Sequence, residues 1–206
     1  MKQDFIKFPL YITIHPFNGF WEMKYEGRGK VRIALLILLL LVLNVTLQKQ
    51  YSGFMVNFSD PRYLNSLKDL QYTILPFLLF CIANWSITTL MEGEGKFKEI
   101  VMSTAYALVP IIIVNLPLTF ISRLMTEEEV AFYYLINGFA VAWFFYLLFI
   151  GNMTVHQFTA AKTIVTLFLT LIAMLIVVFL ATLGFSMAMQ IFYFVYDIYR
   201  ELIFRY

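Results

Sequence analysis

Five long runs of apolar residues, nearly free of charged side chains, divide the chain. They cover residues 31–47, 70–91, 100–122, 130–155 and 163–196. A bilayer core of about 30 Å is crossed by roughly 20 apolar residues in a helix, and the runs meet this requirement. Strands with open edges would leave backbone groups unsatisfied in lipid, and the short alternating pattern of a membrane barrel is absent. We therefore predict an all-α fold, a polytopic transmembrane helical bundle with five spans.

Residues 1–30 precede the first run, and we expect them to form a cytoplasmic or interfacial N-terminal segment. In its second half, the aromatic residues Phe17, Phe20, Trp21 and Tyr25 are interleaved with charged residues. Aromatic rings settle at the level of the lipid headgroups, so this composition predicts a short amphipathic helix in the cytoplasmic leaflet. An ordinary loop before the first span is the alternative. Phe17, Phe20 and Trp21 are candidate contacts for a partner.

Three prolines, Pro76, Pro110 and Pro117, lie within the apolar runs. Each removes one backbone hydrogen bond from a helix and clashes with the preceding turn. We therefore expect kinked helices.

Two short patterns predict where helices begin. Asp60 followed by Pro61 is typical of an N-cap with proline at the first helical position, which predicts an early start of the second helix. Thr126 with Glu129 three residues later forms a capping box, so we expect the fourth helix to begin there.

The last run, residues 163–196, would be about 51 Å long as one helix, which is longer than the bilayer core is thick. The helix either continues beyond the membrane or breaks near Gly184. Aromatic and charged side chains then crowd the C-terminal tail, residues 197–206, and the turns before it. We interpret this surface as a membrane-interface anchor or as a docking site for a partner. Its candidate contacts are Phe192, Tyr196, Tyr199 and Arg200.

The composition agrees with a membrane protein, because 61% of residues are hydrophobic and 14% are charged, against about 45–50% and about 25% in soluble proteins. Residues 31–196 therefore form one membrane domain. A net charge of +2 does not favour a nucleic-acid partner. Cys81 is the only cysteine, so neither a disulfide framework nor a paired-thiol site is expected. The polar and aromatic start does not read as a cleavable signal, so we expect the first apolar run to remain.

Basic residues are unevenly distributed between the two sides of the predicted bundle. Nine Lys and Arg residues lie on the side of the amino terminus and six on the other. Basic loops remain preferentially in the cytoplasm. We expect a multi-pass protein of the plasma membrane with its N-terminus cytoplasmic and its C-terminus outside.

A series of short motifs follows the expected spans in order. They are His15-Pro16, Phe20-Trp21, Gly29-Lys30, Asn84-Trp85-Ser86, Gly93-Glu94-Gly95-Lys96-Phe97-Lys98, Ala105-Tyr106-Ala107-Leu108-Val109-Pro110, Gly151, His156 and Ala160-Ala161-Lys162. This series resembles the Yip domain, a family named for Rab-interacting membrane proteins, over about residues 15 to 183. The resemblance implies five spans and an amino terminus inside. The chain lacks the long N-terminal region of eukaryotic members and is more similar to bacterial ones, for which the resemblance implies a membrane-embedded adaptor.

Amide side chains recur once or more in each apolar run. We interpret them as polar groups that hydrogen-bond between helices and fix their register, each bond contributing roughly 0.6–2 kcal/mol. A polar path for a solute is the alternative, although the central parts of the runs hold no ionisable group of the kind that transport sites usually add. The candidates for interhelical bonds are Asn44, Asn84, Asn115, Asn137 and Gln190, with Asn152 near the end of the fourth run.

The sequence offers no residue set for catalysis, a metal or a cofactor. His15 and His156 are the only histidines and lack the spacing of a zinc site. The loop of residues 92–99 lacks the Lys-Ser/Thr of a phosphate-binding loop and the acidic ligands of a calcium loop, so we expect a charged turn or a contact for a partner. His156 with Lys162 would suit a lipid phosphate, or else simple capping. We expect no enzymatic activity and no cofactor.

These observations lead to one functional hypothesis and two alternatives. The protein is expected to be a non-catalytic adaptor or accessory subunit of a larger membrane complex, with a permease of an ABC-type importer as the first partner to test. The partners are thus membrane lipid and other integral membrane subunits, or a second copy of the chain. The alternatives are a small-solute transporter or channel formed by self-association, and a membrane-shaping or trafficking-type protein.

Overall fold

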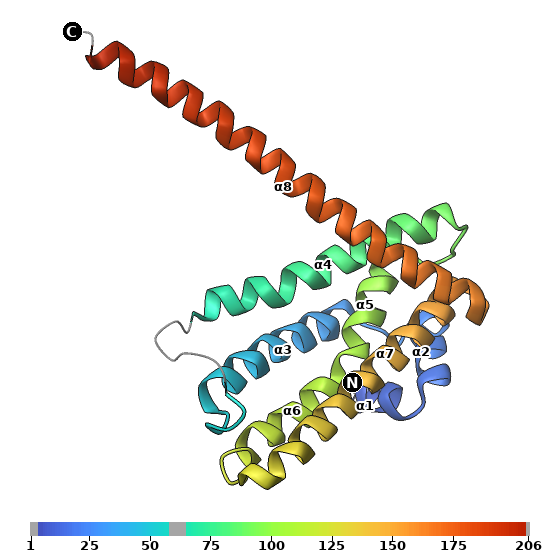
Figure 1. The fold of residues 1–206 in the computed structure, drawn as a ribbon. Coiled ribbons are helices and arrows are strands. Elements are labelled where there is room, and N and C mark those ends of the chain that lie inside the picture. The colour runs from blue at the N-terminus through green and yellow to red at the C-terminus, as the bar shows by residue number, and fades with distance from the viewer. Residues whose placement is uncertain (1–3, 58–64, 205–206) are drawn as a thin grey trace.

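The computed structural model describes residues 4–57 and 65–204, and these residues form helices and connecting loops without any strand. The all-α prediction is therefore confirmed. Figure 1 shows a bundle from which one long helix projects. The elements are α1 (Asp4–Ile14), α2 (Pro16–Tyr25), α3 (Val31–Tyr51), α4 (Ser66–Leu90), α5 (Phe97–Ala107), α6 (Val109–Ile121), the 3-10 turn η2 (Glu127–Glu129), α7 (Val130–His156) and α8 (Ala160–Phe204).

Five stretches of helix are long and apolar enough to cross a membrane, as predicted. They are α3, α4, the pair α5 and α6 together, η2 with α7, and α8. The predicted boundaries lie within four residues of the observed ones, except at the end of α8. The pattern of charged residues located the spans because a charge is costly in hydrocarbon and is therefore confined to the ends.

The third span is two helices, because α5 ends at Ala107 and α6 begins at Val109. Pro110 lies in the first turn of α6, where its missing N–H removes the bond that would continue α5. A kink was expected at Pro110, and the structure has a break between two helices there. Pro76 and Pro117 lie inside α4 and α6, which remain helical through them.

Side chains cap the starts of α4 and of η2. Asn65 caps α4, since its Oδ1 accepts hydrogen bonds from the N–H groups of Leu67 at 3.0 Å and Lys68 at 3.3 Å. The Asp60-Pro61 pair, expected to start this helix, lies outside the described residues. The predicted Thr126–Glu129 capping box is present and opens η2, which continues into α7.

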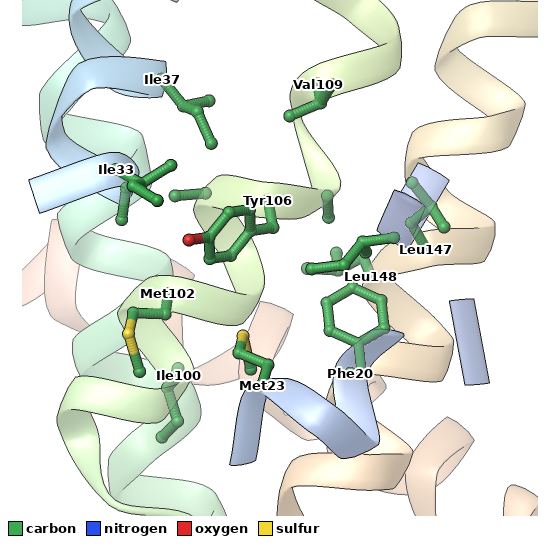
Figure 2. Close-up of a cluster of buried hydrophobic side chains, with 14 of the residues drawn as sticks. Phe20, Met23, Ile33, Ile37, Ile100, Met102, Tyr106, Val109, Leu147 and Leu148 are labelled. Carbon is green, nitrogen blue, oxygen red and sulfur yellow. The ribbon is translucent and has the colours of Figure 1, made fainter. Parts of the chain in front are cut away.

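The core lies between α2, α3, α5 and α7. Figure 2 shows Tyr106 of α5 in its centre, with Met23 and Phe20 of α2 on one side and Ile33 of α3 on another. Tyr106 is fully buried, its ring lies edge-on to Phe8 of α1 at 5.9 Å, and its hydroxyl accepts a hydrogen bond from the N–H of Lys30 at 3.4 Å. The N-terminal helices therefore belong to the bundle and close its core.

The end of the bundle at which α3 finishes is fastened by polar contacts. Lys49 of α3 pairs with the buried carboxylate of Asp69 of α4, with 2.5 Å between Nζ and Oδ1. Beyond α3, the N–H of Gly53 donates to the hydroxyl of Ser122 at 2.8 Å. A Cβ atom on Gly53 would lie 2.1 Å from the carbonyl oxygen of Ser122, so only glycine fits here.

Helix α8 is unbroken over 45 residues, which corresponds to a length of about 68 Å. It continues through Gly184 and through the expected boundary between span and tail at residue 196. Its buried side chains are Thr163, Thr166 and Thr170, which lie in its first three turns. Between residues 175 and 204, every side chain is exposed except Met189, which is half-buried.

Candidate functional site

The loop between α4 and α5 is packed against the C-terminal end of α7 through His156. The imidazole is 1% exposed, and its Nδ1 accepts a hydrogen bond from the N–H of Gly95 at 3.3 Å. A Cβ atom on Gly93 or Gly95 would lie 2.6 Å or 2.5 Å from the ring, so both glycines are required by close approach. The loop was expected to be a charged turn or a partner contact; its charged side chains Glu92, Glu94, Lys96 and Lys98 are exposed, and its glycines lie against the imidazole.

Helix α2 is tied to the same place by Lys24. Its Nζ donates to the carbonyl oxygen of Val155 at 2.8 Å and pairs with Glu94 at 3.3 Å. The Lys24 side chain is only 10% exposed. It lies four residues after Phe20, on the helix face that enters the core, and this spacing could have identified it from the sequence. Three segments distant in sequence are therefore fixed together.

The turn from α7 to α8 continues this cluster. The His156 ring stacks on Phe158 at 5.4 Å, and the Lys162 ammonium lies 4.3 Å from the centre of the Phe158 ring. Such cation–π contacts contribute roughly 0.5–1 kcal/mol at exposed sites. Lys162 therefore covers the aromatic ring against which His156 packs.

Gly151 lets α7 approach both α5 and α2. A Cβ atom there would lie 2.3 Å from the Ser103 hydroxyl and 3.1 Å from the Phe20 ring. Phe20 is fully buried, so its prediction as a partner contact is wrong. The physical reason is that neighbouring helical residues point about 100° apart, and the face bearing Phe20 is the one that enters the core, while Trp21 is turned away.

The outer face of α2 carries three aromatic rings at helical spacing. Phe17, Trp21 and Tyr25 are 52%, 49% and 49% exposed, and the last two rings lie 5.4 Å apart. The helix ends at Tyr25, five residues earlier than the expected segment, and its two faces are clearly different in burial. An exposed aromatic row of this kind suits the headgroup region of a bilayer.

Helix α1, which packs against α2, was not expected from the sequence. The Tyr11 hydroxyl donates to the Glu22 carboxylate at 3.0 Å, and this hydrogen bond raises the pKa of Tyr11 above its ordinary value. Arg28 forms an ion pair with the same carboxylate. The contacts hold the N-terminal helices together at the surface of the bundle.

Two of the predicted interhelical amides bond across helices. The Nδ2 of Asn84 in α4 donates to the hydroxyl of Thr170 in α8 at 3.3 Å. The Nδ2 of Asn44 in α3 donates to the carbonyl of Ile112 in α6 at 3.4 Å. Asn115 is buried and Asn137 is half-buried. Gln190 is exposed, so it does not connect helices within this chain, because α8 has left the bundle at that point.

A small polar cavity lies between α4, α5 and α7. It has a volume of about 10 Å³, and its lining includes Asn84, Ser103, Thr104 and Asn152. The Oδ1 of Asn84 and the Nδ2 of Asn152 have no partner among the described residues. The space is about that of one water molecule, so this cavity does not form a passage for a solute.

The second half of α8 presents the remaining candidate contacts. Phe192, Tyr196 and Tyr199 share one helix face and are 62%, 51% and 61% exposed. Arg200 is exposed beside them, with its guanidinium 5.9 Å from the Phe204 ring. Among the described residues, no group of three or more His, Cys, Asp and Glu side chains is placed to hold a metal ion. What the described residues present is thus helix surface.

The fold and these surfaces define a polytopic α-helical membrane protein whose sequence motifs meet at one end of a five-span bundle. The chain belongs to the Yip1 domain family, since residues 10–182 match that domain. The expected Yip relationship is therefore confirmed. No curated protein and no solved structure matches the chain. The family domain ends at residue 182, so most of the exposed half of α8 lies beyond it.

Proposed function

We propose that the protein is a non-catalytic accessory subunit that docks on a larger membrane complex, and that an ABC-type importer is the complex to test first. The observation that carries this proposal is the second half of α8, which is helical, rich in apolar and aromatic side chains, and exposed over residues 175–204 apart from Met189. Its first part, up to Phe185, borders a groove shared with α4, and the remainder lies away from the bundle. An exposed surface of this size is typical of a site for protein contact.

The length of α8 supports a protein contact in addition to lipid. Its uncharged part, residues 163–196, is about 51 Å long. At a tilt of 40°, the upper end of the usual range, a core of about 30 Å covers only about 39 Å of helix. About eight uncharged residues then emerge, and Phe192 and Tyr196 lie among them. Burial of these rings against protein would remove them from water.

The motif residues at the other end support the same function. Phe20, Tyr106 and His156 are each at most 1% exposed, and the glycines beside them allow the helices to approach closely. These residues serve packing, so they provide a firm base from which α8 projects. With the N-terminus in the cytoplasm, as the basic residues favour, the end of α8 would meet its partner on the outer side.

Gentle purification in a mild detergent and in lipid nanodiscs tests the proposal. Permease-type subunits should accompany the wild-type protein in a fixed stoichiometry. The variant Phe192→Ala/Tyr196→Ala/Tyr199→Ala should lose them, because it removes the aromatic face of α8. A matched control, Ile191→Ala/Val195→Ala/Leu202→Ala, removes exposed side chains from another face and should retain them. A protein that stays free of other subunits under all these conditions would overturn the accessory role.

A second candidate function, action on the membrane surface, is favoured by the row Phe17, Trp21 and Tyr25 on α2. Insertion of such a face between headgroups would expand one leaflet. Purified protein should then bind small vesicles more tightly than large ones, and Phe17→Ala/Trp21→Ala should abolish the difference. Equal binding to both vesicle sizes would exclude this function.

A further inference from the structure

A polar row runs along the exposed half of α8. Ser186, Gln190, Tyr193, Asp197 and Arg200 follow one another at intervals of four, three, four and three residues. All five side chains are exposed. An alternation of four and three is the 3.5-residue repeat of two helices that wind around each other, and it keeps one seam facing the partner along the whole length.

The bundle of the same chain does not reach this polar row. At 3.6 residues per turn, the row lies on the opposite side of α8 from Thr163, Thr166 and Thr170, which face α4. It is also about 100° away from the aromatic face of Phe192 and Tyr196. Helix α8 therefore has three separate faces, and Arg200, at the edge of the polar one, is its only member among the candidate contacts described above.

We propose that this row pairs with the same row of a second copy, so that two α8 helices form a parallel coiled coil. Both copies insert in the same orientation, and a two-fold axis along the membrane normal then sets each residue opposite its own counterpart. A serine hydroxyl and a glutamine amide each donate and accept hydrogen bonds, so Ser186 and Gln190 are complementary to themselves. Asp197 and Arg200 carry opposite charges one turn apart, and each can reach the other's counterpart across the axis.

The polar groups also argue against lipid as the occupant. Acyl chains offer neither donors nor acceptors, so a hydroxyl such as that of Ser186, in the part of α8 that the core covers, loses hydrogen bonds that a neighbouring helix supplies. Within this chain, the Asn84 amide finds such a partner in the hydroxyl of Thr170. The pairing of α8 with itself is independent of the accessory role, because it uses a different face of the helix.

Cysteine cross-linking in native membranes tests the geometry. In a Cys81→Ala background, which removes the single buried thiol, Ser186→Cys, Gln190→Cys and Tyr193→Cys should each give a disulfide-linked dimer under mild oxidation. Ala188→Cys and Val195→Cys, on the far side of the helix, are matched controls and should remain monomeric. Cross-linking at positions 188 and 195 in place of 186, 190 and 193 would overturn the proposal. So would a linked product that contains another protein.

A charge exchange separates pairing from folding. Asp197→Arg and Arg200→Asp should each weaken the dimer in nanodiscs, and the double variant should restore it, because each carboxylate again lies one turn from a guanidinium of the other copy. Gln190→Leu should raise the dimer dissociation constant roughly 3- to 30-fold. All variants should keep the thermal stability of the bundle, since these side chains are exposed. A wild-type protein that is monomeric by mass in nanodiscs at every protein density, or a double variant as weak as the single ones, would refute the coiled coil.

Discussion

The two ends of this molecule are built from similar apolar helices, but the space around their glycines differs. At one end the neighbours leave no room for a side chain, and at the other the space is open. At the motif end, a Cβ atom on Gly151 would lie 2.3 Å from Ser103, and one on Gly95 would lie 2.5 Å from His156. In the second half of α8, the space around Gly184 is open to at least 4 Å. The first region is made of close contacts between helices, whereas the second region offers its surface outward.

This difference shows that an apolar helix surface in a membrane protein can contact either lipid or other helices. An apolar run identifies a segment that belongs in lipid, but it does not say whether the segment also has protein neighbours. Close approach of small residues and bonded polar groups marks protein contact. Thr166 and Thr170 of α8 are buried and bond to side chains of α4 or of the loop after it, whereas no side-chain hydrogen bond to another helix is found after Met174 in the described part of α8.

The largest contrast is expected from removing a tyrosine ring at each end. Tyr106→Ala should lower the free energy of unfolding by about 3–5 kcal/mol, because it empties the centre of the core. Tyr199→Ala should change the unfolding of the monomer by no more than about 0.5 kcal/mol, because this ring is exposed. Unfolding by SDS in mixed micelles measures both values. Similar losses for the two variants would mean that α8 folds back onto the bundle.

Replacing a glycine by alanine should change the free energy of unfolding in opposite directions in the two regions. Gly53→Ala should destabilise the bundle by about 1–3 kcal/mol, since the new Cβ atom meets the backbone of Ser122. Gly184→Ala should stabilise α8 by about 0.5–1 kcal/mol, because alanine restricts the unfolded chain and meets no neighbour. The same unfolding assay applies. A loss of stability for Gly184→Ala would place another helix against that face.

Replacing an amide at each end should change the free energy of unfolding by different but smaller amounts. Asn84→Leu should cost about 0.6–2 kcal/mol, because it removes the bond to Thr170 that joins α4 to α8. Gln190→Leu should leave the unfolding of the monomer unchanged. Thr170→Val provides the matched control for the first bond, and the double variant with Asn84→Leu should be no less stable than the single one. Additive losses would show that the two groups act separately.

The smallest effect on stability is expected at the outer face of α2. Trp21→Ala should alter the free energy of unfolding by no more than about 0.5 kcal/mol, since the ring is half-exposed. The depth of the Trp21 ring in the bilayer is measured instead by fluorescence. The substitutions Trp85→Phe and Trp143→Phe leave Trp21 as the single tryptophan. Quenching should be strongest with lipids brominated near the headgroup. Stronger quenching by lipids brominated near the chain ends would contradict an interfacial helix.

Part of this architecture could be predicted from the chain because it depends on local chemistry. Charge placement defined the spans, the Thr126–Glu129 pair gave the start of the fourth, and Pro110 gave the interruption of the third. Each of these features depends on residues within a few positions of one another. The backbone geometry of a proline or of a cap is the same wherever it occurs.

Features that depend on distant neighbours were not predictable in the same way. Phe20 and Trp21 are equally aromatic, and only the position of α7 decides that the first is buried. Gln190 resembles Asn84 in chemistry, yet only Asn84 lies where a second helix supplies a hydroxyl. Helix α1 could not be predicted, because its apolar part is too short for a span and contains Pro9, which disfavours a helix.

The hydrogen bond between Asn84 and Thr170 fixes α8 near its N-terminal end and leaves most of its length extending away from that contact. From Thr170 to Phe204 the helix extends for about 51 Å, whereas the bond that fixes it lies near its other end. A rotation of about 5° at this junction would therefore move the far end by about 4 Å. Small rearrangements among the buried threonines would therefore displace the C-terminal end of α8 by about the size of a side chain.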